Sequence, residues 1–188
     1  MRYALLALLA VSASLGAQQP ATRRPVVVEQ RAAADSDVKS IDAIMRTFYD
    51  VISGPAGKPR QWSRDRGLYV QDVRFYVLSE RNGAVRMSAM SHQQYVDAVD
   101  SSSTANGFVE FETARCVRRF GHLATVWSAY EGYHGAGATR KAAGRGVNAV
   151  QLYWDGRRWW ITSVSWDSER QENPLPDRTA LCKDTIGS

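Results

Sequence analysis

Two strand-like runs joined by an Asp-Gly pair constrain the fold of this chain more than any other feature. They span residues 148–170 and meet at Asp155-Gly156. Asp-Gly between alternating apolar runs is a strong hairpin signal, because a type I′ turn needs positive φ at both central residues. A two-residue turn predicts one face made of Asn148, Val150, Leu152, Trp159, Ile161 and Ser163. Both faces are half apolar, so we expect helices to cover one and a partner surface the other.

The N-terminus has the pattern of a secretory signal peptide. Arg2 precedes an almost wholly apolar run over residues 3–13, and small residues follow up to Ala17. The run is too short to span a bilayer and the small residues suit cleavage near Ala17; an uncleaved N-terminal anchor is the alternative. We therefore predict a signal peptide over residues 1–17 and an exported protein, periplasmic or secreted, without membrane contact after cleavage.

The rest of the chain has the pattern of one domain. Residues 18–35 mix proline, arginine and alanine with little apolar periodicity, which predicts a flexible leader. Residues 36–180 are near the modal size of a single domain, and residues 181–188 form a C-terminal tail. The formal charge of +5 is scattered along the chain. Since nucleic-acid binding needs a basic stripe, and export also argues against it, we predict no nucleic-acid partner.

The order of helical and strand patterns predicts an α+β domain. Apolar spacing predicts helices over 36–52, 61–69 and from a Ser91–Gln94 capping box to about Val99. Strands are expected at 73–79, 85–90, 108–119 and 122–134, and a glycine-rich loop at 135–146 leads to the closing hairpin. We expect about three helices on the concave face of a curved antiparallel sheet of about six strands.

Two cysteines occur in a chain predicted to enter an oxidising compartment. Cys116 lies on a predicted strand and Cys182 in the C-terminal tail. A disulfide would pin the tail to the sheet and close a long loop. The alternative is a buried free Cys116 with a loose Cys182, because the distance between the two Cα atoms cannot be read from a sequence.

Four stretches of the chain resemble the nuclear transport factor 2-like superfamily, in its SnoaL-like branch. They are FYDVISGPAGKPRQWSRDRGLYVQDVRF, NGFVEFETARCVRRFGHLATVWSAYE, RGVNAVQLYWDGRRWWITSVSWDSER and NPLP. The resemblance implies a cystatin-like cone in which a curved sheet wraps around the first long helix, with a pocket inside and a homodimer formed through the outer sheet face. The superfamily hosts isomerases, hydratases, epoxide hydrolases and cyclases, so the resemblance implies no particular reaction and no catalytic residue.

Few polar side chains are expected to reach such a pocket. Those on the elements that would line it are Tyr49, Asp50, Trp62, Glu110, Tyr130, Asn148 and Trp166. A carboxyl group in an apolar pocket has a raised pKa and can act as acid or base near neutral pH, so Asp50 and Glu110, with Tyr130, are the candidate catalytic residues. The alternatives are that Asp50 caps loop amides near Ser53 and that Glu110 pairs with an arginine.

Three histidines and a glycine-rich loop give no support to metal, phosphate or cofactor binding. His92, His122 and His134 lack metal-ligand spacing. The loop over 135–146 matches no phosphate-binding pattern, and the serines lack a G-x-S-x-G context. We therefore expect no cofactor.

Three hypotheses for the function follow. The preferred one is a pocket protein that binds a small apolar or amphipathic molecule. The others are a cofactor-independent general acid/base enzyme of the isomerase, hydratase or cyclase type, and a pocketless dimerisation or interaction module. An enzyme should show an enclosed cavity with a carboxyl group of raised pKa, a binding protein a cavity without one, and an interaction module a filled cone.

Overall fold

One curved sheet and four helices make up the part of the chain that the computed structural model describes, residues 28–135, 140–176 and 181–183. The helices are α1 (Asp35–Val38), α2 (Ile41–Ile52), α3 (Trp62–Arg66) and α4 (His92–Asn106). The strands are β1 (Tyr69–Arg81), β2 (Ala84–Met90), β3 (Phe108–Phe120), β4 (Leu123–His134), β5 (Lys141–Trp154) and β6 (Trp159–Ser168). The predicted signal peptide and most of the leader lie outside the described residues.

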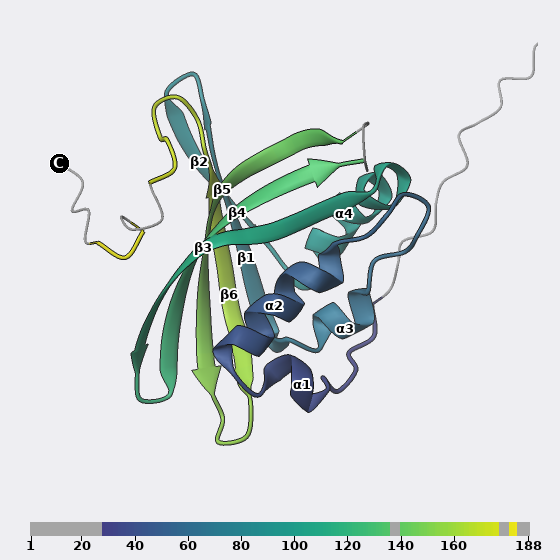
Figure 1. Ribbon diagram of the computed structural model, residues 1–188, viewed down its shortest axis with the longest axis vertical. Coiled ribbons are helices and arrows are strands. Elements are labelled where there is room, and N and C mark those ends of the chain that lie inside the picture. Colours follow the sequence, from purple (N-terminus) through teal and green to yellow (C-terminus); the bar gives the residue numbers. More distant parts are fainter. Residues whose placement is uncertain (1–27, 136–139, 177–180, 184–188) are drawn as a thin grey trace, which may run out of the picture.

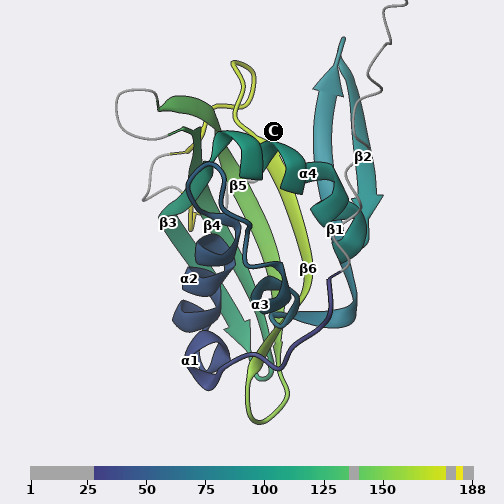
Figure 2. The ribbon, with the colours of Figure 1, turned by 90° about the vertical axis from the view of Figure 1, so that its right-hand side faces the viewer.

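The six strands form one sheet in the order β2-β1-β6-β5-β4-β3, which confirms the predicted strand number. The prediction of a wholly antiparallel sheet was wrong, because β1 pairs with β6 in parallel. Parallel neighbours need a long connection, and here a hairpin strand, a helix and three further strands separate the two. The sheet curves, and the helices lie on its concave side (Figures 1 and 2).

The first predicted helix is divided into α1 and α2. Ser40 has an extended backbone, and its side-chain oxygen accepts a hydrogen bond from the Ala43 amide, so it caps a new helix. The apolar residues of α2 then face the sheet, and Ile44, Met45 and Val51 are fully buried. Helix α2 therefore packs its apolar face against the sheet, as its helical spacing predicted.

Helix α4 continues beyond the predicted end near Val99. The capping box at Ser91 and Gln94 is present at its start, but the helix runs through the polar residues up to Asn106. It ends at Gly107, which has a φ of 70°. The serines and threonine near its end have only modestly lower helix propensity than alanine. Packing of the helix against the domain outweighs this small cost. In Figure 2, α4 crosses one end of the sheet, above α2 and α3.

The β5–β6 hairpin exists but has a longer turn than predicted. Trp154 pairs with Trp159, so four residues rather than two lie between the paired ends. The Asp155 carboxylate accepts hydrogen bonds from the backbone amides of Arg157 and Arg158 at 2.7 and 2.8 Å. These bonds stabilise the wider turn.

A bulge changes the inner face of β6. Leu152 pairs with Ile161 but Gln151 pairs with Ser163, which leaves Thr162 without a partner in the ladder. The extra residue reverses the alternation of side chains beyond it. Val164 and Trp166 therefore face inward, and the prediction that Ser163 lies on the same face as Ile161 was wrong.

The C-terminal tail is attached to the outer face of the sheet. Cys116 and Cys182 form a disulfide with their Cα atoms 5.1 Å apart. Leu181 is buried in a small cluster with Cys116 and Ala129 on that face. Residues 177–180 and 184–188, at the end of the predicted domain and in the predicted tail, lie outside the described ranges. Within those ranges, no helix has the length and apolar character needed to cross a membrane.

Candidate functional site

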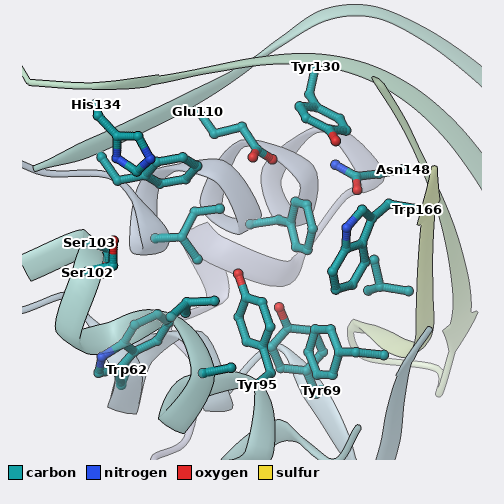
Figure 3. A pocket seen from close by; sticks show the side chains of 17 residues that line it. Trp62, Tyr69, Tyr95, Ser102, Ser103, Glu110, Tyr130, His134, Asn148 and Trp166 are labelled. Atoms are coloured by element: carbon teal, nitrogen blue, oxygen red, sulfur yellow. The ribbon is translucent and has the colours of Figure 1, made fainter. Parts of the chain in front are cut away.

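The concave side of the sheet and the helices line a cavity of about 360 Å³ that is partly open to solvent. Its 17 lining residues come from helices α2, α3 and α4 and from every strand except β2 (Figure 3). Most of the wall is apolar or aromatic, with Phe48, Ile52, Phe75, Phe108, Val164 and Trp166 among its members. A cavity of this kind with a few polar groups is typical of a small-molecule site.

Glu110 projects into this cavity from β3. It lies two residues after Phe108, so both side chains are on the inner face of the strand. The end of α2 holds this part of β3 in place: Ser53 Oγ accepts a hydrogen bond from the Glu110 amide at 3.0 Å and donates one to the Tyr49 carbonyl at 2.7 Å. The Ser53 side chain at the end of α2 therefore fixes the backbone of β3 at Glu110.

The surroundings of Glu110 favour its neutral form. Burial raises the pKa of its carboxyl group from 4.5 to about 7, and the Asn148 amide, which stabilises the charged form, opposes this only in part. Among the described residues, no lysine or arginine forms an ion pair with Glu110, so the expected alternative of an arginine partner was wrong. A carboxyl group that is half-protonated near neutral pH can act as either acid or base.

Tyr95 faces Glu110 across the cavity. Its ring stacks on Phe75 with a centroid distance of 4.8 Å, and its hydroxyl points into the cavity (Figure 3). No residue in the described ranges hydrogen-bonds to that hydroxyl. Burial raises the pKa of Tyr95 far above its usual value, so the group remains a hydrogen-bond donor.

Tyr130 and His134 complete the polar part of the wall from β4. The Tyr130 hydroxyl lies 3.5 Å from Ser168 Oγ, and burial raises its pKa. His134 Nδ1 lies 3.2 Å from the Gly107 carbonyl oxygen, which can only accept, so Nδ1 carries the hydrogen. This contact orients the imidazole ring at the edge of the cavity.

The cavity contains most of the site residues expected from the sequence. Glu110, Tyr130, Trp62, Asn148 and Trp166 all line it. Tyr49 does not line the cavity. Its hydroxyl hydrogen-bonds to the side chains of Ser128 and Asn148 instead.

Asp50 also lies outside the cavity, so the prediction that it acts as a catalytic residue there was wrong. Its side chain is 55% exposed and pairs with Arg64 at 2.5 Å. The reason is helix geometry. Asp50 follows Phe48 by two residues, which is a rotation of about 200° around the helix axis, so it lies on the opposite face of α2.

Sequence reasoning missed Tyr95 and His134 as lining residues. Tyr95 belongs to the apolar face of its helix, and such a residue is expected to be core. His134 ends a strand, where exposure is the default expectation. No pattern in the sequence brings these two side chains together with Glu110; only the packing of α4 against the sheet does so.

The remaining histidines do not form a metal site. His92 is buried and its Nε2 lies 2.7 Å from Asp65 Oδ2, while the Tyr69 hydroxyl donates to Asp65 Oδ1 at 3.0 Å. This buried network supports the cavity wall that Tyr69 forms. Within the residues described, no three His, Cys, Asp or Glu side chains are grouped so as to hold a metal ion.

Comparison with known proteins bears on the fold alone. No family model and no curated protein matches the chain. Among solved structures, it resembles a putative scytalone dehydratase from Novosphingobium aromaticivorans at 13% identity, covering 70% of this chain and 83% of that one, with a TM-score of 0.50. An NTF2-like protein with a cystatin-like fold from the same organism is 15% identical, with coverages of 61% and 71% and a TM-score of 0.43.

A function-unknown protein from Mycobacterium tuberculosis is also similar. It is 20% identical, with a TM-score of 0.45, and the alignment covers 62% of this chain and 66% of that chain, just under two thirds. At such identities the likeness concerns the fold alone. The solved structure with a TM-score of 0.50 agrees with the predicted α+β fold, and none of the three transfers an activity.

Proposed function

We propose that the protein binds a small, largely apolar molecule in the cavity and exchanges a proton with it through Glu110. The observation that carries this proposal is a carboxyl group with a pKa of about 7 inside a partly open, mostly apolar cavity. Perturbed carboxyl groups in clefts are candidates for catalysis, because their protonation can change near the working pH.

The chemistry that the geometry favours is an isomerisation, hydration or dehydration. As a carboxylate, Glu110 would take a proton from the ligand; as an acid, it would return that proton to another ligand atom. Tyr95, on the opposite wall, would donate a hydrogen bond to a ligand oxygen as negative charge develops there. A carbonyl or hydroxyl compound of one or two rings is the substrate class that fits these groups and the volume of about 360 Å³.

Binding without catalysis is the second candidate, since the apolar wall alone would retain such a ligand. The third hypothesis, a filled cone that serves only as an interface, is not favoured by the open volume beside Glu110.

The experiment that separates the first two is proton exchange. A panel of cyclic ketones and alcohols is first screened for binding by thermal shift, and the ligands that bind are incubated with the protein in D₂O. We expect deuterium to enter the bound ligand at a rate that depends on pH with a midpoint near 7, and Glu110→Gln to abolish it. Asp50→Asn is the matched control, because it removes an exposed carboxylate outside the cavity. Binding without exchange at any pH would support the binding function instead.

We also propose that the protein is exported. This rests on the signal-peptide pattern of residues 1–17, and the disulfide between Cys116 and Cys182 is of the kind that persists in an oxidising compartment. Mass spectrometry of the protein recovered outside the cytoplasm should give a mature N-terminus near Gln18.

A homodimer through the outer sheet face is a further proposal. Phe111 and Trp127 are 38% and 50% exposed there, and apolar exposure of this kind favours association. Sedimentation of the wild-type chain should show a dimer. Trp127→Lys, which places a charge on the outer face, should sediment as a monomer.

A further inference from the structure

We propose that a chain of three hydrogen-bonded side chains fixes the orientation of the Asn148 amide and thereby controls how readily Glu110 gives up its proton. The three are Tyr49 on α2, Ser128 on β4 and Glu112 on β3. None of these three residues lines the cavity, so they are positioning residues that act through Asn148. The inference rests on the proposed role of Glu110 but is tested without any substrate.

The hydrogen bonds of this chain are continuous from Asn148, which lines the cavity, to Glu112 on β3. Asn148 Nδ2 donates to Tyr49 Oη at 3.2 Å, and Tyr49 Oη lies 2.6 Å from Ser128 Oγ. Ser128 Oγ in turn donates to Glu112 Oε1 at 2.5 Å. On the cavity side, the Asn148 amide faces the Glu110 carboxyl group (Figure 3).

The direction of the hydrogen bonds is set at the Glu112 end. Its carboxylate is paired with Arg115, whose Nε and Nη2 donate at 2.9 and 2.6 Å, and a carboxylate can only accept. The single hydrogen of Ser128 is therefore committed to Glu112. The hydrogen of Tyr49 must then point at Ser128, which leaves Tyr49 Oη as an acceptor.

Asn148 consequently has one satisfactory orientation. Its NH₂ group, and not its oxygen, must face Tyr49 Oη, and the same NH₂ group then faces Glu110. The flipped amide would set two acceptors against each other at a buried site, at a cost of about 1–3 kcal/mol. Asn148 is 4% exposed and Ser128 0%, so water does not compete for these bonds.

Other titratable groups surround Glu110 without forming part of this chain. They are Tyr95 on α4, and Tyr130 and His134 on β4. Burial raises the pKa of Tyr95 and Tyr130, as it does that of Tyr49, so all three keep their protons while Glu110 titrates. The proposed effect therefore comes from the orientation of Asn148 and not from a change of charge on these tyrosines.

Glu112→Gln is the test, because a glutamine amide can donate to Ser128 where the carboxylate cannot. All hydrogens of the chain can then reverse: Ser128 donates to Tyr49, Tyr49 donates to Asn148 Oδ1, and the flipped amide turns its oxygen toward Glu110. The pKa of Glu110, followed by ¹³C NMR of labelled glutamate carboxyls in the ligand-free protein, should rise by about one unit, a tenfold change in proton affinity. Glu110→Gln assigns the resonance.

The sign of the shift separates this mechanism from simple electrostatics. Removing the negative charge of Glu112 would by itself make Glu110 easier to ionise and lower its pKa. A fall, or no change, would therefore overturn the proposal. Asp42→Asn is the matched control: it removes an 83% exposed carboxylate that also contacts Arg115, and it should leave the Glu110 titration unchanged.

Ser128→Ala is the second variant, in case Glu112→Gln does not fold. It removes the acceptor of the Tyr49 hydrogen without changing any charge, so Tyr49 becomes free to donate to Asn148 and the pKa of Glu110 should again rise. An unchanged titration in a folded Ser128→Ala protein would contradict the proposal. The titration of Glu110 needs no ligand. A failure of the proton-exchange experiment can therefore be told apart from a failure of this proposal.

Discussion

Glu110 and Glu169 show how the surroundings of one side-chain type decide what it can do. Burial raises the pKa of Glu110 to about 7. On the exposed rim, hydrogen bonds from Arg145 and from the Leu175 amide lower the pKa of Glu169 to about 2. Glu169 is therefore a permanent anion that holds the segment after β6, whereas Glu110 changes its protonation near neutral pH. Only the second property is useful for acid or base chemistry.

Glu110 should also make the folded protein less stable at higher pH. The folded state holds the Glu110 proton more tightly than the unfolded state, in which the pKa is near 4.5. The stabilisation by the Glu110 proton is thus fully present below pH 4.5 and is lost as the pH rises to about 7. The free energy of unfolding falls by about 3 kcal/mol over this range, at ~1.4 kcal/mol per pKa unit. Glu110→Gln should match the wild type in urea unfolding at pH 4 and exceed it at pH 8. Equal stability of the two proteins at both pH values would show that the carboxyl group is not desolvated.

Helix α4 brings the wall of the cavity that carries Tyr95 against the sheet, and its ends determine where that wall lies. The capping box at Ser91 and Gln94 satisfies amides at its start. At its end, Gly107 turns the chain into β3 with a φ of 70°. A Cβ at this position would lie 2.8 Å from the Ala56 amide nitrogen, so the loop after α2 packs directly on this glycine.

Gly107→Ala is therefore expected to destabilise the protein by about 2–3 kcal/mol, combining positive-φ strain with a backbone clash. Gly83→Ala is the matched control, because Gly83 also has positive φ, 73°, but nothing lies within 4 Å of its Cβ position. It should cost about 1 kcal/mol through strain alone. The two costs are compared by urea unfolding, and equal costs would mean that the loop yields to the methyl group.

The disulfide joins β3 to the C-terminal tail. Cys116 and Cys182 are 66 residues apart in sequence, and the loop they close includes β4, β5 and β6. By cross-linking the unfolded chain, a bridge of this span restricts its conformations strongly. The tail residue Leu181 also covers Ala129 on the outer face.

Reduction of this bridge should lower the free energy of unfolding by about 4 kcal/mol on the loop-closure argument. Urea unfolding with and without a reductant measures the loss. The double variant Cys116→Ser with Cys182→Ser should be insensitive to the reductant and resemble the reduced wild type. A reductant-independent midpoint in the wild type would contradict the expected stabilisation.

Local pattern in the sequence was enough to predict the α+β class, the long helix within residues 36–52, the capping box at Ser91 and the existence of the closing hairpin. Each of these depends on neighbours in sequence: helical spacing, a side chain that caps its own helix, and an Asp-Gly turn. Glu110 was also a candidate from the sequence, since it is a carboxylate on a strand expected to line the pocket.

Tertiary packing decided the rest. The parallel pairing of β1 with β6 and the bulge at Thr162 depend on contacts between distant segments, and one extra residue reverses every later side chain in a strand. Likewise, Asp50 and Glu110 are equivalent as residue types, and only the orientation of α2 turns one to solvent while the sheet buries the other. The meeting of Tyr95 with Glu110 has no local signal, because burial and its effect on protonation arise only when α4 closes over the sheet.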